Sequence, residues 1–154
     1  MFFFSKLFLF ILNQAKNFIS FQFFSWLQKT QFYQEAESRG FIFGSMLAMK
    51  LNKGFIPVRK PGKLPAKTIR QEFETEYSTD AFEMHEDAIM QGQKVIIVDD
   101  LLATGGTALA AAKLVEKLGG KVIGFCFLIE LSFLHPREKL KGYEIFSLIK
   151  YDEE

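Results

Sequence analysis

The sequence has few of the residues that build disulfide-rich or metal-rich proteins. Its 154 residues include one cysteine, two histidines and four prolines. The single thiol, Cys126, cannot form a disulfide within the chain, which indicates a reducing, cytosolic compartment. Because Cys126 lies in the apolar run GKVIGFCFLIEL, we interpret it as a buried core residue rather than a nucleophile. His85 and His135 lack partners at metal-ligand spacing, so we expect no protein-held metal site.

The chain also lacks an excess of charge of either sign. Its 19 basic and 18 acidic side chains give a net charge of +1, which is not typical of a nucleic-acid-binding protein or an acidic tail. A bound anion must therefore be held by local groups rather than by the overall field of the protein. The length corresponds to one domain, for which about 100–200 residues are usual.

A long apolar run is missing as well, although the first 36 residues are rich in phenylalanine. Ten of the 19 phenylalanines precede residue 34. The longest uninterrupted apolar run, LFLFIL, is far shorter than the ~20 residues that cross a bilayer, so we do not expect a membrane anchor. We expect an atypical segment at 1–36 and a domain at 37–154. For the first segment, an aromatic helix packed on the domain and a start without a structural role are alternatives.

From residue 35 the apolar pattern alternates between helix and strand spacing. Helical spacing at 41–52 precedes a short strand at 55–59. The polar stretch that follows predicts a long loop or a mobile hairpin, and 81–87 alternates like an exposed strand. The remaining expected elements are a strand at 95–100, a helix at 105–120, a strand at 121–131, a short helix or turn at 135–142 and a strand at 143–151. This order predicts an α/β fold with a mainly parallel, twisted sheet flanked by helices.

The segment VIIVDDLLATGGT joins an apolar strand, two acids and a small turn. We expect Asp99 and Asp100 to emerge at the end of the strand on opposite sides, where carboxylates can accept hydrogen bonds from vicinal hydroxyls. The first amides of the next helix lack internal partners, so they and the nearby threonine hydroxyls form a phosphate cradle. Its residues are Ala103, Thr104, Gly105, Gly106 and Thr107. The combination indicates a ribose 5-phosphate site. A tight turn with incidental acids is the alternative, whereas the lysine of a Walker A loop and a GxGxxG fingerprint are absent.

This motif resembles the phosphoribosyl-diphosphate signature of type I phosphoribosyltransferases, and its ending is similar to that of members that use adenine. Further segments that resemble the family are, in order, ESRGFIFG (37–44), VRKPGKLP (58–65), EYSTDAFEMHEDAI (76–89) and IELSFLHPREKL (129–140). The resemblance implies the fold of that family, with a mobile hood loop. It also implies transfer of 5-phosphoribose from phosphoribosyl diphosphate to adenine, giving AMP and diphosphate, with substrate-bound Mg²⁺ in a cytoplasmic homodimer.

The resemblance also implies roles for single residues. Diphosphate would be bound by Ser38, Arg39, Arg59, Lys60 and Lys63, the catalytic hood residues would be Glu76 and Tyr77, and Leu131 would lie against the base. These residue types suit the roles, because cations attract a polyanion, a carboxylate accepts a proton or stabilises a cation, and an apolar face suits a flat base. The alternatives are a surface ion pair for Arg39, a solvated face for the basic segment and an exposed loop acid for Glu76.

The region before Glu37 departs from the family's pattern. The residues QKTQFYQEA stand where the family has an apolar strand, so we expect that strand to be missing and apolar surface to be left unpaired. No segment matches the family's N-terminal hood strand near the base. A phosphoribosyltransferase for another base and a non-catalytic nucleotide-binding relative therefore stay open as alternatives.

Overall fold

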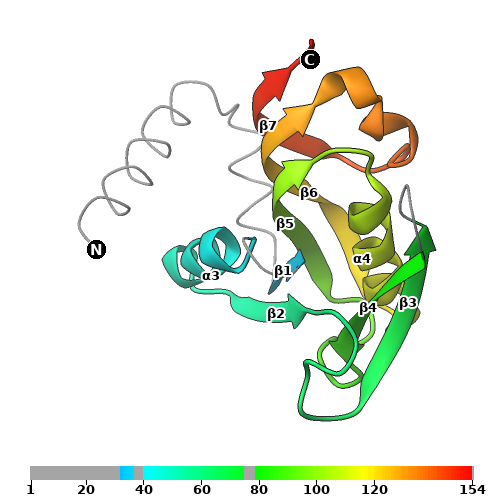
Figure 1. Ribbon diagram of the computed structural model, residues 1–154. Coiled ribbons are helices and arrows are strands. Elements are labelled where there is room, and N and C mark those ends of the chain that lie inside the picture. The colour runs from blue at the N-terminus through cyan, green and yellow to red at the C-terminus, as the bar shows by residue number, and fades with distance from the viewer. Residues whose placement is uncertain (1–31, 37–39, 75–78, 154) are drawn as a thin grey trace.

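The computed structural model describes residues 32–36, 40–74 and 79–153 (Figure 1). Its large sheet has five strands in the order β2-β1-β5-β6-β7, and every neighbouring pair in it is parallel. This confirms the predicted α/β fold with a mainly parallel sheet. Residues 1–31, and with them most of the Phe-rich segment and its alternative interpretations, lie outside the described residues.

The elements follow one another in a regular order. The large sheet consists of β1 (Phe32–Ala36), β2 (Gly54–Val58), β5 (Lys94–Leu102), β6 (Lys121–Leu131) and β7 (Ile145–Tyr151). The remaining elements are α3 (Gly40–Lys50), β3 (Thr68–Glu74), β4 (Thr79–His85), α4 (Gly106–Lys117) and the two 3-10 turns η1 (Ser132–Leu134) and η2 (Pro136–Glu138). The strand expected at 121–131 has the predicted bounds, and the helix expected at 105–120 begins at Gly106.

The strand before Glu37, which we expected to be missing, is present as β1. It lies inside the large sheet, where Phe32 pairs with Gly54 of β2 on one side and with Val95 of β5 on the other. Neighbours on both sides supply the ladder hydrogen bonds, so the backbone can form a strand even where its polar residues give no strand pattern. The expectation of an unpaired apolar edge at this position is therefore wrong.

The two long helices cover opposite faces of the large sheet (Figure 1). Ile96 and Val98 of β5 pack with Ala48 of α3, whereas Ile97 packs in a cluster with Ala108 of α4. The small alanine side chains let α4 lie close to the sheet. This alternation along β5 is typical of a central parallel strand that is buried on both faces.

The segment after β2 folds as a hairpin, one of the two predicted alternatives. Thr68 pairs with His85 and Glu74 with Thr79, so β3 and β4 form a separate antiparallel sheet. The long-loop alternative is wrong for residues 68–74. The strand predicted at 81–87 is present as β4 (Thr79–His85), but its predicted exposure is wrong, because Phe82 and Met84 are buried in a cluster with α4 residues such as Leu114. The hairpin therefore belongs to the core, with one face against α4.

Helix α3 is apolar on all sides and only partly covered. Gly44 and Ala48 are buried, whereas 49% of Ile42 and 78% of Met49 is exposed. Met49 therefore lies outside the core of the described residues. In the described part of the chain, no helix has the length and hydropathy that a membrane span needs.

Candidate active site at the carboxyl edge of the sheet

The candidate site lies where the strand order of the large sheet reverses. From β1 the chain passes through α3 outward to β2, whereas from β5 it passes through α4 in the other direction to β6. Because all five strands are parallel, their carboxyl ends share one edge, and ligands of open α/β sheets bind at such a reversal point. The segments that follow β1 and β5 flank this point. They are the two segments predicted to bind diphosphate and ribose 5-phosphate.

The acidic pair lies within β5 rather than at its end, which corrects the prediction. The strand runs to Leu102 because β6 continues beside it as far as the Leu102–Glu130 pair. Pairing with β1 stops earlier, at Val98. Asp99 and Asp100 therefore directly follow Val98, the last residue of β5 that pairs with β1. Both acids are half-buried, and the Asp100 N–H donates to Oδ1 of Asp99 at 2.9 Å.

The turn between β5 and α4 has the backbone that a phosphate cradle requires. Gly105 adopts a left-handed conformation with φ of 80° and precedes the first helical residue, Gly106. No side chain caps this helix end, and its first turn contains no acidic residue. The first amides of a helix point outward and carry the positive end of the dipole, so this end attracts an anion. Thr107 is exposed and Thr104 is half-buried beside it.

Two other segments press against this turn. A Cβ atom added at Gly105 would lie 2.9 Å from the carbonyl oxygen of Pro136, and one added at Gly106 would lie 3.5 Å from that of Glu74. The turn is thus placed between η2 and the end of β3. Residues 75–78, which include Glu76 and Tyr77, lie outside the described residues. They connect β3 to β4, so this connection leaves the hairpin at Glu74, next to the cradle.

The basic segment after β2 is attached to β4. Arg59 and Glu83 exchange backbone hydrogen bonds of 3.0 and 2.7 Å, and the Gly62 N–H donates to Oε2 of Glu83 at 3.0 Å. The Lys60 ammonium lies 2.8 Å from Oδ2 of Asp80. This contact, together with the Ala81 N–H, holds the pKa of the Asp80 carboxyl below its ordinary value. Lys63 is exposed.

Arg59 also connects the basic segment to the start of α3. Its guanidinium lies 5.9 Å from the ring centroid of Phe41 and donates to the carbonyl oxygen of Lys63 at 3.0 Å. Phe41 is the second residue of α3. Ser38 and Arg39, the other residues predicted to bind diphosphate, lie outside the described residues, but the chain continues from them into α3. The contact of Arg59 with Phe41 therefore brings two predicted diphosphate segments together.

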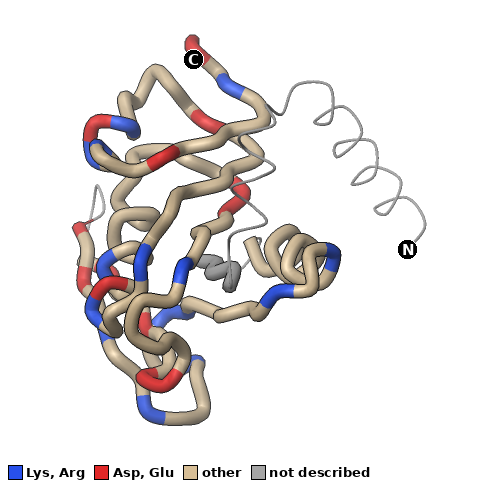
Figure 2. The backbone as a smooth tube through the Cα atoms, turned by 180° about the vertical axis from the view of Figure 1, so that it is seen from behind, with Lys and Arg blue, Asp and Glu red and all other residues tan. Residues whose placement is uncertain are grey.

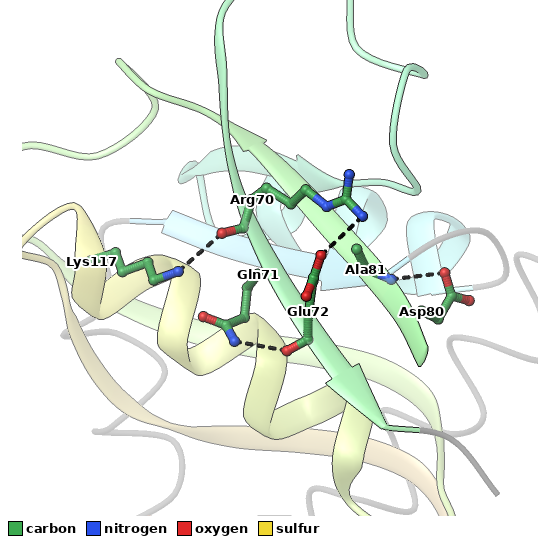
Figure 3. A network of polar contacts seen from close by, with 6 residues as sticks. All are labelled: Arg70, Gln71, Glu72, Asp80, Ala81 and Lys117. Carbon is green, nitrogen blue, oxygen red and sulfur yellow. Dashed lines mark hydrogen bonds and ion pairs between the residues drawn. The ribbon is translucent and has the colours of Figure 1, made fainter. Parts of the chain in front are cut away.

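The hairpin is attached to α4 by polar contacts as well as by its core (Figure 3). The Lys117 ammonium donates to the carbonyl oxygen of Arg70 at 3.0 Å, and Arg70 pairs with Glu72 at 3.2 Å. Basic and acidic positions are interspersed over the hairpin and the neighbouring loops (Figure 2).

An ion pair between a buried acid and an exposed arginine lies next to the predicted base contact, and no prediction from the sequence included it. Leu131, the predicted contact, is half-buried at the end of β6. The preceding residue, Glu130, is only 2% exposed, and it accepts hydrogen bonds from Nε and one terminal nitrogen of Arg137 at 2.7 and 2.8 Å. An acid in an otherwise apolar strand run was the available signal, because a buried carboxylate needs a partner.

The described residues hold no cluster of three or more histidine, cysteine or acidic side chains that suits a metal ion. Asp99 and Asp100 are the acids nearest to the cradle along the chain, and they provide hard oxygen atoms. Mg²⁺ prefers such oxygens but usually keeps several waters and substrate oxygens as well. The residues present therefore fit an ion that arrives with an anionic substrate.

Known proteins with similar sequences and structures identify the family of this chain. The model of the phosphoribosyl transferase domain family covers residues 37–150. An adenine phosphoribosyltransferase of Thermoanaerobacter sp. (strain X514) is 64% identical over 115 residues, which make up 75% of this chain and 66% of that protein. The chain thus spans about two thirds of the length of this curated relative.

Solved structures agree with the sequence relatives. The adenine phosphoribosyltransferase of Thermoanaerobacter pseudethanolicus is similar with a TM-score of 0.80 and 54% identity, over 92% of this chain and 84% of that one. The Saccharomyces cerevisiae enzyme, complexed with an imino-altritol bisphosphate and adenine, has a TM-score of 0.76 and 43% identity, over 90% and 74% of the two chains.

Proposed function

The chain belongs to the phosphoribosyl transferase family, within its adenine phosphoribosyltransferases, and on that premise we propose that it forms AMP and diphosphate from adenine and phosphoribosyl diphosphate. Such a reaction serves purine salvage. The observation that carries the proposal is the β5–α4 connection, in which Asp99 and Asp100 precede an uncapped helix start at the reversal point of the sheet. Acids and amides in that order suit the ribose hydroxyls and the 5-phosphate of one ligand.

The binding groups divide the substrate between them. Asp99 and Asp100 accept hydrogen bonds from the ribose hydroxyls, and charge-assisted bonds of this kind are about twice as strong as neutral ones. The 5-phosphate is bound by the turn Ala103 to Thr107, whose glycines let the backbone approach closely. Leu131 lies against the flat face of adenine.

The diphosphate is held by cations from two segments. Arg59, Lys60 and Lys63 follow β2, and Ser38 and Arg39 follow β1. The contact between Arg59 and Phe41 supports their convergence, because it joins the end of β2 to the start of α3. Mg²⁺, held mainly by diphosphate and ribose oxygens, would offset the negative charge of the leaving group.

The reaction replaces the bond from C1 of the ribose to the diphosphate by a bond to N9 of adenine. Positive charge develops at C1 in an oxocarbenium-like transition state, and the base loses or shares the proton at N7. Glu76, beside Tyr77, accepts that proton or stabilises the cation, for which a positioned general base typically contributes about 10²-fold or more. The proximity of Glu74 to the phosphate turn supports this role, since the hairpin connection starts there.

We further propose that the protein is a cytoplasmic homodimer. The exposed side of α3 supports the dimer, because Ile42 and Met49 present apolar surface seven residues apart on one helix. Sedimentation at several concentrations tests this proposal, with Met49→Lys as the variant expected to dissociate. The single cysteine supports a reducing compartment.

The decisive assay supplies labelled adenine, phosphoribosyl diphosphate and Mg²⁺ to the full chain. We expect AMP to form, and we expect neither hypoxanthine nor guanine to react at a comparable rate. Turnover of another purine in place of adenine would identify a phosphoribosyltransferase for a different base. Binding of AMP without any turnover would contradict the proposed activity and indicate a non-catalytic nucleotide-binding relative.

A further inference from the structure

The ion pair between the buried Glu130 and Arg137, whose side chain is 42% exposed, has no role in the reaction proposed above. Glu130 is the one charged residue among the buried side chains of the described residues, with 2% of its surface exposed. Both of its oxygens accept hydrogen bonds from the Arg137 guanidinium, at 2.7 and 2.8 Å. The Arg137 guanidinium favours the carboxylate and holds the pKa of Glu130 below its ordinary value of 4.5. Glu130 is therefore a buried carboxylate held by two hydrogen bonds from one guanidinium.

The pair joins the two ends of one loop. Glu130 is the penultimate residue of β6, and Arg137 lies in η2, seven residues later. Between them the chain passes through η1 and His135, which has a left-handed backbone with φ of 49°. Such a conformation is costly for a residue with a side chain and persists only where the surroundings hold it. The ion pair fixes the ends of this irregular loop across a short distance.

Each end of the loop contacts a different part of the proposed substrate site. Leu131, the proposed base contact, directly follows Glu130. At the other end, the carbonyl oxygen of Pro136, next to Arg137, packs against Gly105 so closely that a Cβ atom there would approach it to 2.9 Å. Gly105 belongs to the phosphate turn. The ion pair thus fixes the position of the proposed base contact, Leu131, relative to the phosphate turn at Gly105.

We propose that Glu130 and Arg137 are positioning residues that set the spacing between the base contact Leu131 and the phosphate turn at Gly105. This inference rests on the proposed function. It predicts that the pair acts on ligands that occupy both ends of the site and not on ligands that occupy one end. AMP occupies both ends, whereas ribose 5-phosphate reaches only the ribose and phosphate groups. Loss of the pair therefore weakens AMP binding more than ribose 5-phosphate binding.

A purely structural role is distinguishable, because an ion pair with a buried member is often replaceable by apolar residues of similar volume without loss of stability. The double variant Glu130→Met/Arg137→Met removes both charges together and leaves no unpaired buried charge. Arg137→Lys is the conservative variant, which keeps the charge but loses the two-pronged geometry. Arg70→Lys is the matched control, because Arg70 forms an ion pair with Glu72 at the surface, with 55% of its side chain exposed.

The experiment measures binding of AMP and of ribose 5-phosphate by calorimetry on the full chain, together with thermal unfolding and the KM for adenine. For the double variant and Arg137→Lys we expect AMP to bind about tenfold more weakly while ribose 5-phosphate changes by less than about threefold. The KM for adenine rises with the loss of AMP affinity. Arg70→Lys changes the affinity for neither ligand.

Two outcomes overturn the inference. One is a folded double variant that binds AMP as the wild type does, and the other is an equal loss for both ligands. If the double variant does not fold, Arg137→Lys decides by the same comparison. Failure of the proposed function has a different signature, since the wild-type protein itself would then show no AMP formation from adenine.

Discussion

The turn between β5 and α4 and the loop between β6 and β7 lie at the same edge of the sheet but are held in different ways. The turn depends on residues next to one another in the sequence, namely a glycine with positive φ and an uncapped helix start. The loop depends on an ion pair between residues seven positions apart, one of which is buried in a strand. Local sequence therefore determines the first region, and tertiary contacts determine the second.

The largest expected effect comes from the acids before the turn. Replacing both acids, Asp99→Asn with Asp100→Asn, removes charge-assisted hydrogen bonds worth about 1.5–3 kcal/mol each, so AMP affinity should fall about 10²-fold or more. The fold should persist, because both side chains are only half-buried and asparagine has nearly the same shape as aspartate. Calorimetry with AMP and circular dichroism measure the two quantities.

The matched control for this variant is another adjacent pair of acids. Glu86→Gln with Asp87→Asn removes the same charge from the exposed turn after β4. We expect it to leave AMP binding unchanged. Wild-type affinity in the Asp99 and Asp100 variant would show that the ribose hydroxyls are bound elsewhere.

The second prediction concerns the contact between the two regions. Gly105→Ala forces an alanine into a left-handed conformation and brings its Cβ to 2.9 Å from the Pro136 carbonyl oxygen. The conformation alone costs about 1–2 kcal/mol, and the steric contact raises the total loss of unfolding free energy to about 2–4 kcal/mol. Urea unfolding measures this loss, and KM for phosphoribosyl diphosphate should rise with it.

Gly92→Ala is the control for the backbone term. Gly92 has nearly the same φ, 79°, but nothing lies within 4 Å of an added Cβ. The unfolding free energy of Gly92→Ala should therefore fall only by the cost of the left-handed conformation, about 1–2 kcal/mol. If both variants lost the same unfolding free energy, the contact between Gly105 and Pro136 would make no contribution to stability. The turn and the loop would then not be coupled through it.

The third prediction tests the ion pair of the loop through pH. In the folded protein Arg137 lowers the pKa of Glu130 below its ordinary value of 4.5, so the unfolded chain takes up a proton at higher pH than the folded protein does. The stabilisation is complete above about pH 4.5 and is lost as the pH falls through the folded pKa.

Glu130→Gln should therefore lower the unfolding free energy by about 1–3 kcal/mol at pH 7 and by progressively less in acid. Urea unfolding across this pH range, with Glu138→Gln as control, measures the difference. A cost that does not vary with pH would contradict it.

The smallest expected effect concerns the basic segment, which is another long-range assembly. Asp80→Asn releases Lys60 from an ion pair that is largely exposed, with 59% of the lysine side chain accessible, and exposed pairs contribute only about 0.2–1 kcal/mol. Without the Asp80 carboxylate, Lys60 has one ion pair fewer to give up when it binds diphosphate, so inhibition by diphosphate should tighten about two- to fivefold. Glu72→Gln, on the same hairpin but not bonded to Lys60, should show no such change. Weaker inhibition in Asp80→Asn would mean that Asp80 orients Lys60 for the ligand.

Much of the fold was predictable because its signals are local. The alanine-rich helix after the glycine turn and the apolar run from Lys121 to Leu131 have the expected type and nearly the expected bounds. The strand pattern of β3 was weaker, since its side chains alternate between solvent and a half-buried face. Its pairing with β4 and its packing on α4 became visible only in the structure.

The candidate site shows the same division. The order of strand, acids, small turn and helix between Val95 and Lys117 predicted the turn that we propose to bind phosphate, because each feature is a property of adjacent residues. The partners of Lys60 and Arg59 were not predictable, since each contact joins segments that are separated along the chain. An acid in an apolar strand predicts that some partner exists but does not say which residue it is.

The sequence by itself determined the glycine turn, the two acids before it and the alternation of strands and helices, because backbone propensity and side-chain spacing act within a few residues. Only the tertiary structure decided that Phe32–Ala36, whose sequence FYQEA has no clear strand pattern, form a central strand. Neighbouring strands on both sides supply its hydrogen bonds. Tertiary structure likewise placed the loop after β6 against Gly105, because the contact of the Pro136 carbonyl oxygen with Gly105 joins segments that are distant in the sequence.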